Sequence, residues 1–265
     1  MPHSIEQKKY RTVIVSDVHL GSQWSSAKEA TRFIQENSCE RLILCGDIID
    51  GWAIMRGARE KWKRKHTEFM KAVLDISVDS KVIYIKGNHD DFLERIVPIS
   101  FANISLVNDY ILECGDKRYF VLHGDIFDNI TTSAKWLSKL GDIGYSTLLM
   151  FNRLYNFIRL KRGLPDVSFA SNIKQRVKTS VSQLSNFEEN LAELARSKRC
   201  QGVICGHIHR PEIKMIDGVE YLNSGDWIDS LSALVEDFEG NWSLVWTEKK
   251  EDNKEKQKKG KETKE

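Results

Sequence analysis

The sequence is poor in cysteine and contains no C-x-x-C pair. Its five cysteines are odd in number, and two of them, Cys45 and Cys205, lie inside apolar runs. We therefore expect neither a disulfide framework nor a zinc knuckle. Residues 1–9 are polar and lead into an apolar run without the hydrophobic core of a signal peptide. Together these features predict a reducing, cytoplasmic location.

An excess of charge of one sign is also missing. Forty basic residues oppose 38 acidic ones, a net charge of +2, and the excess lies in the lysine-rich tail after Glu248. A general nucleic-acid binder usually carries a basic surface, so nucleic acid is not favoured as a partner. No uninterrupted apolar run is long enough to cross a membrane, because Gly141, Gly144 and polar residues break the apolar stretch at 131–162.

What the sequence does contain is enough apolar side chain for one large domain. The chain has 265 residues, of which 41% are hydrophobic. We expect a single domain over residues 1–247 that includes a helical insertion at about 131–197. The tail, 248–265, mixes lysine and glutamate without apolar residues and is predicted to be disordered.

The stretch 42–50 is the most informative part of the chain. Four apolar residues predict a buried strand, after which Gly46 turns the backbone and Asp47 and Asp50 follow. Ligands of α/β folds collect in the loops that leave the strand ends. A carboxylate has two oxygens, so Asp47 is placed to bridge two cations.

Similar patterns recur along the chain. Strands are expected at 11–16, 41–45, 81–86, 110–114, 117–122, 201–205, 213–216, 219–222, 232–236 and 243–247, and helices at 27–36 and 61–77. Five of these strands end in D-x-H, G-D-x-x-D, G-N-H-D, H-G-D or G-H-x-H. One such ending is ordinary turn or helix-cap chemistry, but five are hard to explain in that way. The glycines at 46, 87, 124 and 206 suit sharp turns beside a crowded site.

The side chains at these strand ends predict a metal centre. Oxygen and imidazole donors without a thiolate suit two divalent ions, with manganese expected first and iron or zinc as alternatives. The candidate ligands are Asp17, His19, Asp47, Asn88, His123, His207 and His209.

At these residues the chain resembles the calcineurin-like metallophosphoesterase superfamily, with the motifs in the family's order from 17 to 209. The resemblance implies an α/β fold, a two-sheet β-sandwich flanked by helices (αββα), with the metals at one edge. It also implies that one ion is held by Asp17, His19, Asp47 and His209. The other ion would be held by Asp47, Asn88, His123 and His207.

His89 follows Asn88 directly and is predicted to be the catalytic residue, as general acid or as stabiliser of the leaving group. Asp50 or Asp17 would orient its ring. The alternative is a structural histidine. The remaining histidines, His3 and His66, are expected at the surface.

The phrases at 87–93 and 207–211 resemble the UDP-2,3-diacylglucosamine diphosphatase branch, whose members carry a helical lid where acyl chains lie. That resemblance implies a metal-activated hydroxide that cleaves the pyrophosphate of a UDP-linked diacyl sugar and releases UMP. His89 stands where enzymes of that branch often have arginine.

The insertion is apolar over more than one face at 131–162 and carries a basic rim. This indicates contact with acyl chains or with the inner face of the membrane, while a buried subdomain helix and a dimer interface remain open. Lys174 and Lys178, one helical turn apart, are candidates for binding the pyrophosphate, with a solvated helix face as the alternative.

Other functions are compatible with the motifs. A phosphodiesterase or phosphatase of the same superfamily would act on a cyclic nucleotide, a phospholipid head group or a phosphoprotein. A third hypothesis is a non-catalytic scaffold with this fold. A metal assay separates the scaffold from the enzymes, and a substrate panel separates the enzymes from one another.

Overall fold

Two β-sheets form the centre of the computed structural model, which describes residues 8–55, 62–127 and 186–249. The first sheet has seven strands in the order β12 (Trp242–Trp246), β11 (Ser232–Glu236), β1 (Lys8–Val15), β2 (Asn37–Cys45), β3 (Lys81–Ile85), β5 (Ile104–Val107) and β4 (Ile99–Phe101). The second has five, in the order β6 (Asp109–Cys114), β7 (Lys117–Leu122), β8 (Gly202–Cys205), β10 (Val219–Asn223) and β9 (Glu212–Ile216).

The central strands of both sheets run parallel. In the first sheet β1, β2, β3 and β5 are parallel, with Val13 opposite Leu42 and Ile43 opposite Ile83. In the second sheet β7, β8 and β10 are parallel. The carboxyl ends of neighbouring parallel strands meet at one edge of their sheet, which gathers the loops after β1, β2 and β3 and those after β7 and β8.

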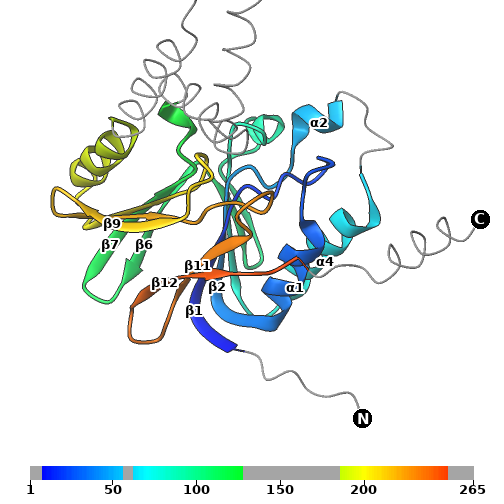
Figure 1. The fold of residues 1–265 in the computed structure, drawn as a ribbon, viewed down its shortest axis with the longest axis horizontal. Helices are drawn as coiled ribbons and strands as arrows, with labels where there is room; N and C mark the ends of the chain where they lie inside the picture. Colours follow the sequence, from blue (N-terminus) through cyan, green and yellow to red (C-terminus); the bar gives the residue numbers. More distant parts are fainter. Residues whose placement is uncertain (1–7, 56–61, 128–185, 250–265) are drawn as a thin grey trace, which may run out of the picture.

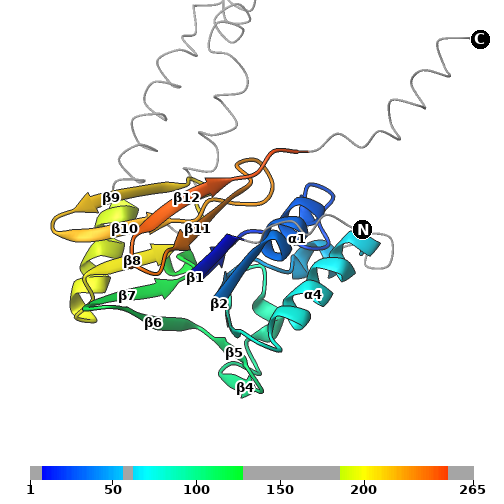
Figure 2. The same cartoon turned by 90° about the horizontal axis from the view of Figure 1, so that it is seen from below.

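Helices cover the outer faces of both sheets, on opposite sides of the molecule (Figures 1 and 2). The first sheet is covered by α1 (Ala27–Glu36) and α4 (Arg64–Ile76), which bury Phe33 and Phe69 in its apolar cluster. A helix at 186–197 covers the second sheet and buries Phe187 and Leu191. Between the sheets lies a third cluster that includes Ile43 and Ile204. The expected αββα sandwich is therefore confirmed.

Short helices lie in the loops at the strand ends. These are α2 (Gly51–Met55) after β2, η1 (Asp91–Leu93) after β3 and η2 (Asp125–Phe127) after β7. The helices α2 and η1 directly follow the G-D-x-x-D and G-N-H-D motifs, and η2 begins at Asp125, the last residue of H-G-D.

Several expectations need correction. The strands β4 and β5 and the helix α2 were not expected, and β2 begins at Asn37, directly after α1, rather than at residue 41. The expectation of a surface position for His66 is wrong, since its side chain is completely buried. His3, most of the predicted insertion and nearly all of the tail lie outside the described residues. In the described part of the chain, no helix is long and apolar enough to cross a membrane.

Candidate metal centre

Five of the seven predicted metal ligands have left-handed backbone conformations. Their φ angles lie between 49° and 68°, a region that non-glycine residues seldom adopt: Asp17, His19, Asp47, His207 and His209. Such backbones cost on the order of 1–3 kcal/mol each and persist where the surrounding structure holds them, typically at functional sites. The backbone conformation thus marks the strand ends as a site independently of the side-chain motifs.

Hydrogen bonds between loops hold these residues in place. The loops after β1 and β2 are joined by the Asp17 N–H to the Gly46 carbonyl, 3.0 Å, and by the His19 N–H to the Asp47 carbonyl, 2.9 Å. The loop after β3 is attached by the His89 N–H, which donates to Asp47 Oδ1 at 2.8 Å. Three segments far apart in the sequence therefore share one framework.

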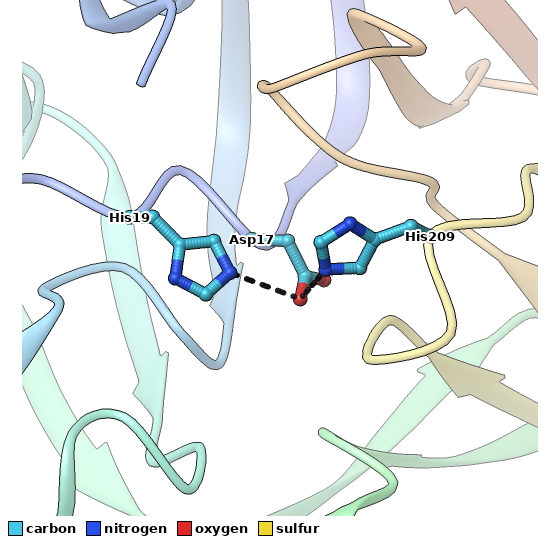
Figure 3. A group of neighbouring side chains, drawn as sticks. All are labelled: Asp17, His19 and His209. Carbon is cyan, nitrogen blue, oxygen red and sulfur yellow. Dashed lines mark ion pairs between the residues drawn. The ribbon is translucent and has the colours of Figure 1, made fainter. Parts of the chain in front are cut away.

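The first group of potential ligands surrounds Asp17 (Figure 3). Asp17 Oδ1 lies 3.1 Å from His209 Nε2 and 3.8 Å from His19 Nε2. The other oxygen, Oδ2, accepts a hydrogen bond of 3.0 Å from the His207 N–H. One carboxylate oxygen of Asp17 is thus used to fix the loop after β8, and the other faces two imidazoles.

The second group consists of Asp47, His123 and His207. His123 Nε2 lies 3.3 Å from Asp47 Oδ1 and 3.2 Å from His207 Nδ1. His123 Nδ1 lies 3.0 Å from the Cys45 carbonyl, which can only accept, so this nitrogen carries the proton. A second nitrogen fixed in this way leaves Nε2 with the lone pair that a metal ligand needs.

Asp47 lies between the two groups. Its Oδ1 faces His123, while its Oδ2 lies 3.7 Å from His19 Nε2. This is the arrangement expected of a bridging carboxylate.

Three buried polar atoms here have no hydrogen-bond partner among the described residues, namely Asp17 Oδ1, His19 Nε2 and Asn88 Oδ1. Buried polar atoms without partners are rare and costly. All three belong to predicted ligands, and divalent ions would satisfy them. The donor set and these atoms therefore fit the predicted pair of cations.

The electrostatics of the two groups point the same way. Burial opposes charge on His123, but Asp47 raises the pKa of His123 to about 10. Burial also opposes charge on His19, and Asp17, Asp50 and Asp47 raise its pKa to about 10. Although burial works against it, the pKa of Asp47 is lowered, chiefly by His123. The carboxylates thus hold positive charge strongly, and metal binding here would release protons.

Comparison with known proteins identifies the family. Residues 10–211 match the model of the calcineurin-like phosphoesterases. The chain belongs to this family. It is 23% identical over 228 residues to a UDP-2,3-diacylglucosamine hydrolase of Shewanella halifaxensis (strain HAW-EB4), covering 84% of this chain and 93% of that protein. It is 24% identical over 240 residues to the enzyme of that name from Aeromonas salmonicida (strain A449), covering 84% and 89%.

Among solved structures, a novel archaeal phosphodiesterase is similar, with a TM-score of 0.41 and 15% identity over 88% of this chain and 98% of that one. The family membership makes the protein a metal-dependent phosphoester hydrolase.

In this phosphoesterase, His89 lies beside both groups. Its Nδ1 is 3.0 Å from Asp50 Oδ1, and its Nε2 is 3.9 Å from Asp47 Oδ2. The second Asp50 oxygen is 3.8 Å from His19 Nδ1. Of the two carboxylates considered from the sequence, Asp50 is the one in hydrogen-bond contact with His89. The ring of Trp52 packs against His89, with centroids 4.2 Å apart and the ring planes tilted by 38°.

Sequence reasoning missed Asp90 as a structural part of the site. This buried carboxylate accepts hydrogen bonds from the N–H groups of Ile48, Ile49 and Gly87 and from the Tyr84 hydroxyl. It therefore ties the loop that carries Asp47 to the loop that carries Asn88. The signal was present, because Asp90 is the last residue of G-N-H-D. Lys174 and Lys178 lie outside the described residues.

Two glycines show how closely the backbone approaches the ligands. A Cβ on Gly87 would lie 2.3 Å from Asp47 Oδ1. A Cβ on Gly206 would lie 2.4 Å from Ser16 Oγ and 2.5 Å from Asp17 Oδ2. Real side chains do not tolerate such distances, so each position requires glycine for space.

Proposed function

We propose that this phosphoesterase hydrolyses the pyrophosphate of a UDP-linked diacyl sugar and releases UMP. The observation that carries the catalytic part is the pair of ligand groups on either side of Asp47, together with three partnerless atoms. Support for the substrate comes from the relatives named UDP-2,3-diacylglucosamine hydrolase, which align over most of their length.

We assign the two metal groups as follows. One ion is held by Asp17, His19, Asp47 and His209, and the other by Asp47, Asn88, His123 and His207. When bound, a pair of divalent ions activates water near neutral pH and neutralises charge on the phosphoryl oxygens. Manganese is our first choice, with iron or zinc as alternatives, because the donors are oxygen and imidazole without thiolate.

The protein's own groups supply orientation and a proton. Asp50 fixes the His89 ring through Nδ1, which leaves Nε2 directed towards Asp47. From that position we assign His89 as the general acid that protonates the leaving oxygen. The His123 Nδ1–Cys45 contact and the Asp17–His207 contact hold the loops of the two sheets in register.

Other phosphoesters are the second candidate. Hydrolysis of a cyclic nucleotide, a phospholipid head group or a phosphoprotein needs the same metal groups. What favours the UDP-linked lipid is the resemblance together with the apolar, basic-rimmed sequence at 131–162. Lys174 and Lys178 remain our candidates for contact with the pyrophosphate, and membrane-surface contact from the cytoplasmic side remains a prediction.

A substrate panel with added Mn²⁺ tests the proposal. It comprises a UDP-diacyl sugar, a cyclic nucleotide, a glycerophosphodiester and a phosphopeptide. We expect the UDP-diacyl sugar to have the highest kcat/KM and UMP to appear as product. Faster turnover of another member would reassign the substrate, and absence of turnover with two bound ions would favour the scaffold reading.

The contribution of the insertion can be measured separately. Replacing Leu154 and Ile158 with glutamate should weaken turnover of the diacylated substrate, because acyl chains avoid charge. Hydrolysis of a small chromogenic phosphodiester should stay near wild type. Equal losses on both substrates would show that these side chains belong to the core and not to an acyl site.

A further inference from the structure

The buried histidine of α4 has no role in the chemistry described above, yet it contacts the loop that carries His19. His66 lies in the first turn of α4 and is completely buried. Its Nδ1 accepts hydrogen bonds from the Gly21 N–H at 3.2 Å and from the Lys63 N–H at 3.1 Å. Because Nδ1 accepts, the ring proton is on Nε2 and the imidazole is neutral.

The loop held by His66 is short and closed on itself. Gly21 follows His19 by two residues, and the Ser22 N–H donates to the His19 carbonyl at 2.9 Å. The Ser25 hydroxyl donates to the Val18 carbonyl at 2.6 Å. On the side of β2 the loop is held by backbone hydrogen bonds, among them the Leu20 N–H to the Ile48 carbonyl at 2.8 Å, and its far end from Gly21 onward is held by contacts with helices.

The first turn of α4 supplies two of those contacts. Besides the His66 bond to Gly21, Lys65 Nζ donates to the Ser25 carbonyl. From the other side, Ile54 of α2 packs so closely that a Cβ on Gly21 would lie 2.7 Å from its Cγ1. The loop thus contacts both α2 and α4, and of the two hydrogen bonds from α4 the His66 bond lies closer in sequence to the predicted ligand.

We infer that His66 is a positioning residue that holds the loop at 17–22 so that His19 faces Asp17 and Asp47. The inference rests on the proposed function, because that function makes His19 a metal ligand whose position matters. His66 itself touches neither substrate nor reacting atoms. Its effect passes through the Gly21 backbone to His19, whose left-handed conformation, φ 49°, needs support from its surroundings.

The charged groups around His66 agree with a neutral acceptor. Burial and the nearby ammonium groups of Lys65 and Lys63 lower its pKa to about 4. Near neutral pH the imidazole therefore keeps the lone pair that binds Gly21.

Two conservative variants separate this role from a general contribution to stability. In His66→Asn the amide oxygen stands near the place of Nδ1, whereas in His66→Gln it reaches towards Nε2. We expect His66→Gln to release one bound Mn²⁺ per chain to a chelator roughly tenfold faster, the lower end of effects for residues that orient metal ligands. Its kcat on a chromogenic phosphodiester should fall similarly with KM little changed, and His66→Asn should stay within about threefold of wild type.

Val73→Ala serves as the matched control, since Val73 is buried two turns along the same helix. It should lower the melting temperature without faster metal release. The inference is overturned when His66→Gln retains its metal like wild type, or releases it no faster than Val73→Ala, or when the Asn and Gln variants behave alike.

The same assay on His19→Ala keeps the two claims apart. Full retention of both ions in His19→Ala would contradict the proposed metal site. Loss of an ion in His19→Ala together with normal retention in His66→Gln would contradict only the role of His66.

Discussion

The two sheets contribute different chemistry to the site. The carboxylates of the two metal groups, Asp17 and Asp47, follow β1 and β2 of the seven-stranded sheet, as does Asp50, which contacts His89. The strands β7 and β8 of the five-stranded sheet instead supply the imidazoles of His123, His207 and His209. The carboxylates thus all come from one sheet, which also supplies His19, while the other sheet supplies imidazoles to both groups.

This difference shows that the candidate metal centre is assembled from loops of both sheets. The shortest contacts between acids and imidazoles of the two groups, His209 to Asp17 at 3.1 Å and His123 to Asp47 at 3.3 Å, run from one sheet to the other. Neither set of loops alone completes the group around Asp17 or the group of Asp47, His123 and His207. We therefore expect changes at the edge where the sheets meet to weaken metal binding more than changes within either sheet.

The largest effect is expected when the carboxylate facing both groups is neutralised. Asp47→Asn should lose at least one ion and about 10³-fold or more in turnover, because charge stabilisation at both ions depends on it. Elemental analysis and kcat check this. Asp79→Asn, at an exposed acid in the turn after α4, is the control and should change neither. If Asp47→Asn binds two ions and keeps near-normal activity, Asp47 does not bridge the two ions.

The next largest loss of turnover is expected at His89, which lies on the side of the seven-stranded sheet. General acid catalysis is typically worth about 10²–10⁴-fold, so His89→Ala should lose that much on a substrate with a poor leaving group. Hydrolysis of a nitrophenyl ester, whose leaving group needs no proton, should fall much less.

His89→Arg sharpens the assignment, since arginine supplies charge but no transferable proton. It should retain cleavage of a pyrophosphate better than cleavage of poor-leaving-group diesters. Rates within a few-fold of wild type for His89→Ala on every substrate, with metals intact, would make His89 structural.

A smaller effect, on metal binding, is expected when a methyl group is added beside the ligands of each sheet in turn. Gly87→Ala places a methyl group against Asp47, and Gly206→Ala places one against Asp17 and Ser16. Each should weaken Mn²⁺ binding roughly 10–100-fold, the range for disturbed support of metal ligands. Gly115→Ala, in the open β6–β7 turn, should cost stability alone. Normal metal affinity in both variants would mean that the loops yield more easily than the backbone contacts indicate.

The smallest effect is expected in the pH dependence of stability, through His66, which lies away from the edge where the two sheets meet. The pKa of His66 is lowered from 6.5 to about 4, so its contribution to stability is complete above 6.5 and is lost as pH falls towards 4. Urea midpoints at pH 7.5 and 5 should therefore differ less for His66→Asn than for wild type. An equal or larger shift in the variant would show that His66 accepts a proton as readily folded as unfolded.

Much of the fold followed from local patterns. The apolar runs predicted β3 and β7 nearly residue for residue, and the periodic stretch at 27–36 is α1 as expected. These elements can be predicted from the sequence because each buries a continuous apolar face. By contrast, β4 is exposed at all three residues and lies at the sheet edge, so no alternation marks it. The five residues of α2 are too few to show a helical period.

The sequence by itself determined which side chains are available at the strand ends, because motif residues directly follow apolar strands and glycines leave space beside them. Only the tertiary structure decided how they pair. Asp50 rather than Asp17 contacts His89, Asp90 joins two loops, and His66 is buried against Gly21. Each pairing joins segments about 40 residues apart, and such contacts depend on strand order and loop conformation, which no local pattern in one sequence records.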